Sequence, residues 1–152
     1  MYKRQIEDNI RYGKLDATEE EIRAAAKTVC ADEFIMGLEN GYKTEMYEGG
    51  SQLSGGQRQL VSFARTLISD PKILILDEAT SSIDAKTEKE LQKGLQELLK
   101  GRTSFIIAHR LSTIKNCDKI MFISNKGITE AGTHDELMAK KGDYYKLCMA
   151  QK

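Results

Sequence analysis

Two short blocks of the sequence carry residue types that handle phosphate. The first block holds two glycines between hydrogen-bonding side chains, in the order Leu53, Ser54, Gly55, Gly56 and Gln57. The second is an aliphatic run, residues 73–76, that is followed by Asp77 and Glu78. Glycines at a helix start leave backbone N–H groups open to an anion. Neighbouring carboxylates can hold a metal ion and polarise a water molecule, so together the two blocks predict phosphate chemistry.

The first block must lie at the start of a helix to do this. Apolar residues recur with helical spacing from residue 60 to residue 68, and Pro71 ends the pattern. The positive end of the helix dipole would then face the glycines, and an oxyanion could approach the backbone there. A second interpretation stays open, because Ser54 and Gln57 have the spacing of a capping box, which needs no ligand.

The two acids must emerge where a strand ends. Four consecutive aliphatic residues, 73–76, indicate a strand that is covered on both faces of its sheet. Ligands of α/β sheets bind at the carboxyl ends of the strands, which is where Asp77 and Glu78 would lie. Because neighbouring strand residues point to opposite sides, the strand has to end at Asp77 if both carboxylates serve one site. The alternative is a solvated turn with two exposed acids.

Together, the blocks resemble the nucleotide-binding domain of ABC transporters. Residues 53–57 match the signature motif of that family, and residues 73–77 with Glu78 match its Walker B strand. Residues 82–84 are similar to its D-loop, and residues 101–112 to its switch-histidine segment. Residues 44–52 resemble the exporter-type stretch that faces the membrane domain, although Tyr47 and Gly49 depart from the exporter pattern. The likeness extends from residue 6 to residue 151.

The resemblance implies a role for each matching residue. Asp77 would bind Mg²⁺, Glu78 would orient or deprotonate the attacking water, and His109 would contact the γ-phosphate of ATP. Ser82 and Asp84 would lie in the D-loop, close to the ATP site and to a second subunit. The signature residues would contact ATP, and they are Leu53, Ser54, Gly55, Gly56 and Gln57.

A complete site of this family also needs a Walker A loop, and the sequence contains none. The only Gly-Lys pair is Gly13-Lys14, which lacks a glycine five residues earlier and a serine or threonine after the lysine. The Q-loop glutamine would likewise precede Met1. The expected fold is therefore a truncated P-loop NTPase-like ABC ATPase domain of the α/β class. It would join a helical subdomain, residues 1–71, to the C-terminal half of the parallel β/α core, residues 72–152.

The resemblance also implies partners and a location. Two such domains pair head to tail, with each ATP between one Walker A loop and the other domain's signature helix. The chain would need that second nucleotide-binding domain, a missing N-terminal lobe with Walker A, and the transmembrane domain of an ABC exporter. It would lie at the cytoplasmic side of the cell membrane and couple ATP hydrolysis to transport, but by itself it is expected to be inactive.

Two other functions are compatible with the same motifs. The chain could be the C-terminal lobe of a DNA-repair or chromosome-maintenance ATPase, although it shows no sustained heptad pattern. It could also be a non-catalytic remnant, although its motifs are intact. With 23 basic and 23 acidic residues and no basic block, its charge does not favour nucleic acid as a partner.

The remaining patterns describe an intracellular chain of helices and strands. Cys30, Cys117 and Cys148 are widely spaced, so neither a disulfide framework nor a zinc site is expected. No apolar run reaches the roughly 20 residues that span a bilayer. His134 starts a capped helix and is predicted to be a surface residue. Capping boxes at residues 18–21 and 133–136 predict helices, the second continuing as one terminal helix. The expected strands are residues 73–76, 103–108, 119–124 and 128–131, with a helix at 85–100.

Overall fold

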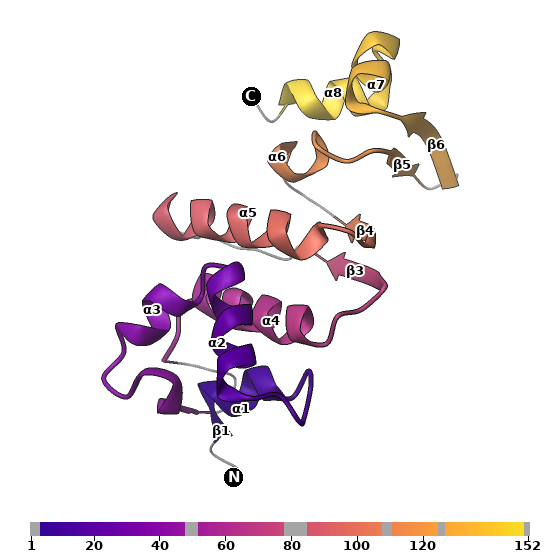
Figure 1. Ribbon diagram of the computed structural model, residues 1–152. Coiled ribbons are helices and arrows are strands. Elements are labelled where there is room, and N and C mark those ends of the chain that lie inside the picture. Colours follow the sequence, from indigo (N-terminus) through magenta and orange to yellow (C-terminus); the bar gives the residue numbers. More distant parts are fainter. Residues whose placement is uncertain (1–3, 48–51, 78–84, 108–110, 125–126, 151–152) are drawn as a thin grey trace. The chain divides into compact units, whose positions relative to one another are not determined.

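The computed structural model describes residues 4–47, 52–77, 85–107, 111–124 and 127–150 (Figure 1). They form two compact units. The first contains residues 4–76 and 85–105, and the second contains Asp77 and residues 106–150. The sequence pattern changes after residue 71, where a boundary between the helical subdomain and the β/α core was expected. That domain boundary stays a prediction.

The first unit is mainly helical. Helix α4 lies at its centre and packs against α1, α2 and α5 (Figure 1). Short strands β1 and β2 pair antiparallel, which the sequence patterns did not predict. The helices are α1 (Ile6–Arg11), α2 (Glu19–Thr28), α3 (Asp32–Met36), α4 (Gly55–Ile68) and α5 (Ala85–Leu99), with a 3-10 turn at Gly41–Lys43. The strands are β1 (Arg4–Gln5), β2 (Glu45–Met46), β3 (Ile73–Asp77) and β4 (Thr103–Ile107). The last residue of β3, Asp77, and the last two of β4 are assigned to the second unit.

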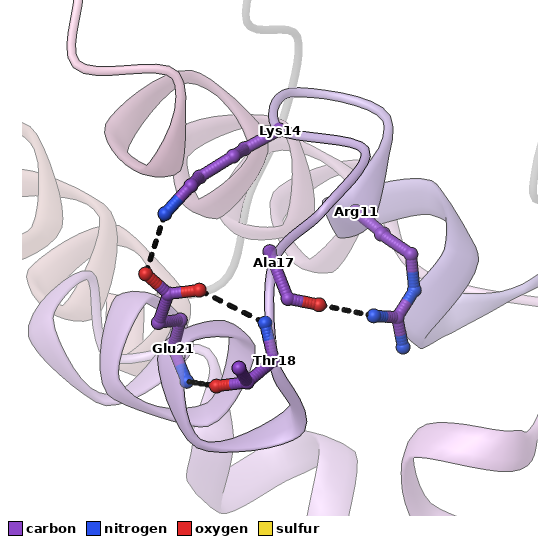
Figure 2. Close-up of polar contacts among 5 residues, drawn as sticks. All are labelled: Arg11, Lys14, Ala17, Thr18 and Glu21. Carbon is purple, nitrogen blue, oxygen red and sulfur yellow. Dashed lines mark hydrogen bonds and ion pairs between the residues drawn. The ribbon is translucent and has the colours of Figure 1, made fainter.

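The loop between α1 and α2 is held by polar contacts, which Figure 2 shows. Thr18 Oγ1 accepts a hydrogen bond from the Glu21 N–H at 3.2 Å, and the Glu21 carboxylate accepts one from the Thr18 N–H at 2.9 Å. The predicted capping box is therefore confirmed. Lys14 Nζ lies 2.5 Å from the same carboxylate, and the Arg11 guanidinium donates to the carbonyl of Ala17. One glutamate thus fixes both the helix start and the loop before it.

Two helices of this unit approach each other through a glycine. A Cβ atom on Gly94 of α5 would lie 2.5 Å from the carbonyl oxygen of Val29 and 3.4 Å from Leu60. No side chain fits at that position, although glycine inside a helix costs about 0.5–1 kcal/mol relative to alanine. The close approach brings α5 against the end of α2 and onto α4, and Leu95 and Leu98 join the core there.

Strands β3 and β4 are joined by α5 and form a parallel β–α–β unit. Leu74 and Leu76 point into the helical core. Ile73 and Ile75 lie on the other side and are 62% and 71% exposed. The aliphatic run predicted a strand that is covered on both faces. That prediction is wrong for the described residues, because they cover one face of the sheet and leave the other open.

The second unit combines a hairpin with three short helices. Strand β5 (Ile120–Ser124) pairs antiparallel with β6 (Gly127–Gly132). Helices α6 (Leu111–Ile114), α7 (His134–Lys140) and α8 (Asp143–Ala150) complete the unit. Its core consists of Ile120, Leu137, Tyr144 and Cys148. Among the described strands, parallel pairing is therefore confined to β3 and β4.

The C-terminal segment forms two helices where the sequence predicted one. Lys141 ends α7 in the left-handed region, with φ of 52°. The Glu130 carboxylate then caps α8, accepting hydrogen bonds from the N–H groups of Asp143 at 2.6 Å and Tyr144 at 3.3 Å. The missed break depends on Glu130, which is distant in sequence.

His134 was predicted to be a surface residue, and the structure adds a contact that the sequence did not predict. Its side chain is half-buried, and Nδ1 lies 2.7 Å from the hydroxyl oxygen of Tyr144. Burial raises the pKa of Tyr144, so its hydroxyl stays protonated. The pair ties the start of α7 to α8.

Candidate functional site

The signature residues form the start of α4. Ser54 is the N-cap, and its Oγ accepts a hydrogen bond from the Gln57 N–H at 3.2 Å. Gln57 Oε1 accepts one from the Ser54 N–H at 3.0 Å. The capping box that the spacing predicted is therefore present. It does not compete with ligand binding, because a hydroxyl that accepts one hydrogen bond can still donate its own proton.

The backbone at this helix start is open. Ser54 and Gly55 are exposed, while Leu53 and Gly56 are buried. No described residue accepts a hydrogen bond from the N–H groups of Gly55 and Gly56. A Cβ atom on Gly55 would meet only the tip of Arg58, 3.9 Å away, and φ of Gly55 is not positive. The fold of the chain itself therefore does not require glycine at position 55.

Charge at this helix start is favourable for an anion. The first turn of α4 holds no acidic residue, and the helix is 14 residues long. The Arg58 guanidinium donates to the carbonyl of Leu53 at 2.6 Å, which fixes the entry to the helix and adds a positive charge nearby. Free N–H groups, the helix dipole and this cation together suit a phosphate group.

Asp77 ends β3 as the sequence predicted. Its side chain is exposed and forms no hydrogen bond or ion pair with the other described residues. The carboxylate can therefore take a cation. Within the described residues, no cluster of three or more His, Cys, Asp or Glu side chains is placed to hold a metal ion.

The structure brings one part of the predicted site together. It places residues 53–57 at one helix start. The other predicted site residues, Glu78, Ser82, Asp84 and His109, lie outside the described residues, so their roles stay predictions.

Sequence reasoning missed the contacts of Gln52. Its side-chain oxygen accepts a hydrogen bond from the Tyr47 N–H at 3.2 Å, and its Nε2 donates to the carbonyl of Glu45. This amide ties β2 to the residue that precedes the signature motif. Gln52 lies in the stretch 44–52 that resembles the exporter pattern. No local sequence pattern, however, predicts a hydrogen bond between residues that are five to seven positions apart.

The model of the family described as "ABC transporter" matches residues 2–81. The Bacillus subtilis protein named "Uncharacterized ABC transporter ATP-binding protein YfiC" is 50% identical over 99% of this chain. The ATP-dependent lipid A-core flippase of Desulfotalea psychrophila is 52% identical over 97% of it. The chain spans 25% and 26% of the lengths of these two relatives.

A solved structure agrees with these sequence relatives. It is that of a bacterial Atm1-family ABC exporter with ATP bound, and it matches 99% of this chain with a TM-score of 0.87 and 39% identity. The match covers 26% of the exporter chain. No helix in the described part of the chain has both the length and the apolar character to cross a membrane. This chain belongs to the ABC transporter family, in which it corresponds to part of an exporter-type nucleotide-binding domain.

Proposed function

We propose that the chain is part of the ATP-binding and ATP-hydrolysing subunit of an ABC exporter, where it couples ATP hydrolysis to transport across a membrane. The observation that carries the proposal is the open start of α4. Gly55 is exposed, and alanine could replace it without a clash. No described residue accepts a hydrogen bond from the N–H groups of Gly55 and Gly56. A glycine that the fold does not need is explained by a ligand that approaches the backbone.

In this proposal, the start of α4 serves an ATP molecule that a second nucleotide-binding domain holds. The N–H groups of Gly55 and Gly56 and the hydroxyl of Ser54 donate to its phosphate oxygens. Leu53 is buried in the core and fixes the residues before the helix. Gln57 holds Ser54 in place through the capping box. The two domains pair head to tail, so that each presents its α4 to the nucleotide of the other.

The end of β3 serves the chain's own nucleotide. Asp77 offers its free carboxylate to Mg²⁺, which would neutralise phosphate charge when it is bound. Glu78 accepts a hydrogen bond or a proton from the attacking water. His109 donates an N–H to the γ-phosphate. Ser82 and Asp84, in the D-loop, contact the second domain near this water.

The proposal includes three partners. A segment of the longer protein supplies the Walker A loop, a second nucleotide-binding domain completes the sites, and a transmembrane domain carries the substrate. The complex would lie on the cytoplasmic side of the cell membrane. The 152 residues alone would bind MgATP weakly and would not hydrolyse it, because the Walker A loop makes most phosphate contacts. No observation favours a DNA-repair ATPase or a nucleic-acid partner.

A chimera tests this function. We would replace the matching 147 residues of the Desulfotalea flippase by this chain and measure ATP hydrolysis by the purified protein. We expect turnover close to that of the parent flippase. The Glu78→Gln variant should lose turnover, while the control Asp135→Asn, which changes an exposed acid in α7, should keep it. A folded chimera without turnover would contradict the proposed function. Normal turnover of the Glu78→Gln variant would contradict the role of that residue.

A further inference from the structure

The peptide group that joins Leu53 to Ser54 is held at both of its polar ends. Its carbonyl oxygen accepts a hydrogen bond from Arg58 Nη1 at 2.6 Å, and its N–H donates one to Gln57 Oε1 at 3.0 Å. We call this arrangement the peptide clamp. Because a peptide group is planar, hydrogen bonds at both ends stop the group from rotating. The clamp therefore fixes the direction of the backbone at the point where α4 begins.

The residues around the clamp need such a restraint. Gly55 and Gly56 have no Cβ atom, so their backbone has more accessible conformations than that of any other residue type. Before the clamp, the buried side chain of Leu53 holds the chain in the core. After it, Ser54 has the extended backbone of an N-cap, with φ of −63° and ψ of 162°, and its hydroxyl accepts a hydrogen bond from the Gln57 N–H. A rotated peptide group would change φ of Ser54 and break this cap.

Arg58 lies where a helix by itself disfavours a positive charge. It is the fourth residue of α4, close to the positive end of the helix dipole. The first turn holds no acidic residue that would offset this charge. The side chain turns back toward the helix start, as long helical side chains do, and reaches a carbonyl group five residues earlier. The arginine is therefore better explained by the group that it holds than by the stability of the helix.

We infer that Arg58 is a positioning residue for the nucleotide that α4 meets. It holds the Leu53 carbonyl, and through the clamp it keeps the Ser54 hydroxyl and the N–H groups of Gly55 and Gly56 directed at a phosphate group before the nucleotide arrives. Donors that are aligned in advance lose less conformational freedom on binding, so they bind more tightly. The inference rests on the proposed function, because these donors must face ATP.

An arginine near a phosphate group can also act through its charge alone. Salt weakens that effect, because the screening length falls from about 10 Å at 0.1 M salt to about 3 Å at 1 M. The hydrogen bond from Arg58 to Leu53 is short and partly buried, so salt weakens it much less. The salt dependence of an Arg58 variant therefore separates positioning from charge.

The first measurement needs no nucleotide. Amide hydrogen exchange in the 152-residue chain, followed by NMR, reports whether the N–H groups of Ser54 and Gln57 are held. Arg58→Met keeps a long aliphatic side chain and removes the guanidinium. We expect it to speed exchange at both N–H groups by roughly fivefold or more, and to leave Leu60 and Phe63, farther along α4, unchanged. Exchange at the wild-type rate would overturn the clamp, and with it the inference.

The second measurement uses the flippase chimera and a non-hydrolysable ATP analogue. Energy transfer between labels on the two nucleotide-binding domains gives the analogue concentration at which half of the domains pair. A folding defect lowers the amplitude of this signal but not that concentration. We expect Arg58→Met to raise the concentration by roughly tenfold, at about 1 M salt as well as at about 0.1 M. Arg58→Lys keeps N–H donors at nearly the same reach, and should raise it by less than roughly threefold.

Arg23→Met is the matched control. It removes the same charge from an exposed position on α2, where the guanidinium lies over the ring of Tyr42, 5.5 Å from its centroid. This variant should pair at the wild-type concentration. Pairing of Arg58→Met at that concentration would overturn the inference, and so would a difference that disappears at high salt. If Arg58→Met does not fold, Arg58→Gln, whose shorter side chain carries no charge, decides by the same criteria.

The two proposals fail separately. A chimera whose pairing depends on Arg58 but that does not hydrolyse ATP contradicts the proposed function and leaves the positioning role standing. A chimera that hydrolyses ATP, with pairing that ignores Arg58→Met, contradicts the positioning role alone.

Discussion

Replacing Gly55 by alanine should separate folding from function. Gly55 is the first residue of α4, and the added methyl group would come no closer than 3.9 Å to the tip of Arg58. Alanine is favoured over glycine inside helices by about 0.5–1 kcal/mol, and the gain at the first position should be at the lower end. The isolated chain should therefore unfold at the same urea concentration as the wild type or slightly higher.

The same methyl group should harm the ATP site. It would stand beside N–H groups that are proposed to donate to phosphate oxygens, and a hydrogen bond to a charged group contributes about 1.5–3 kcal/mol. Weakening one such bond in the transition state should lower turnover by roughly tenfold to a hundredfold. The assays are urea unfolding of the 152-residue chain, followed by circular dichroism, and ATP hydrolysis by the flippase chimera.

Gly94→Ala is the matched control, because it makes the same chemical change in a packed part of a helix. Its Cβ would lie 2.5 Å from the Val29 carbonyl oxygen, so α5 has to move away from α2. We expect a loss of about 1–3 kcal/mol of stability, less the gain in helix propensity. The reasoning is refuted if Gly55→Ala destabilises the chain as much as Gly94→Ala does. Normal turnover of Gly55→Ala would refute it as well.

Three further variants test polar contacts, each of which lies within one of the two units. Glu130→Ala removes the carboxylate that caps α8, which should cost about 1 kcal/mol and speed amide hydrogen exchange in α8 but not in α4. Tyr144→Phe removes the hydroxyl that lies 2.7 Å from His134 Nδ1, and should lower the free energy of unfolding by about 1 kcal/mol in denaturant titrations. The hydrogen bond from Lys14 lowers the pKa of Glu21. The ionised Glu21 carboxylate therefore stabilises the fold above the ordinary carboxyl pKa of about 4.3, and this contribution is lost as pH falls through the lowered pKa. Urea midpoints measured from pH 7 to pH 3 should therefore fall less steeply for Glu21→Gln than for the wild type, and equal slopes would contradict this.

Helix starts were predictable because their signals are local. Each of the capping boxes at Thr18, Ser54 and Thr133 joins residues three apart, and each is formed in the structure. The strand before Asp77 was also predictable, since four aliphatic residues in a row have few other uses. These elements position the signature residues and Asp77, which are the part of the site that lies within the described residues.

Features that depend on distant residues were not predictable. Strands β1 and β2 are two residues long, too short to show an alternating pattern, and they form only because they pair. The break before α8 depends on Glu130, and the position of His134 depends on Tyr144. The aliphatic run predicted that both sides of β3 are buried, because such a run is suited to apolar contact on both sides. The described residues provide that contact on one side only.

The most direct test of the account asks whether the start of α4 serves the ATP of a second domain. One chimera would carry Gly55→Asp, which puts a negative charge against the phosphates, and another would carry a defect in the flippase's Walker A lysine. Each should be inactive alone, and ATP hydrolysis should return when the two are assembled together, because one mixed site then has an intact lysine and an intact α4. Mixed assemblies that form but stay inactive would contradict the head-to-tail account, and full activity of the Gly55→Asp chimera alone would contradict the role of the signature glycine.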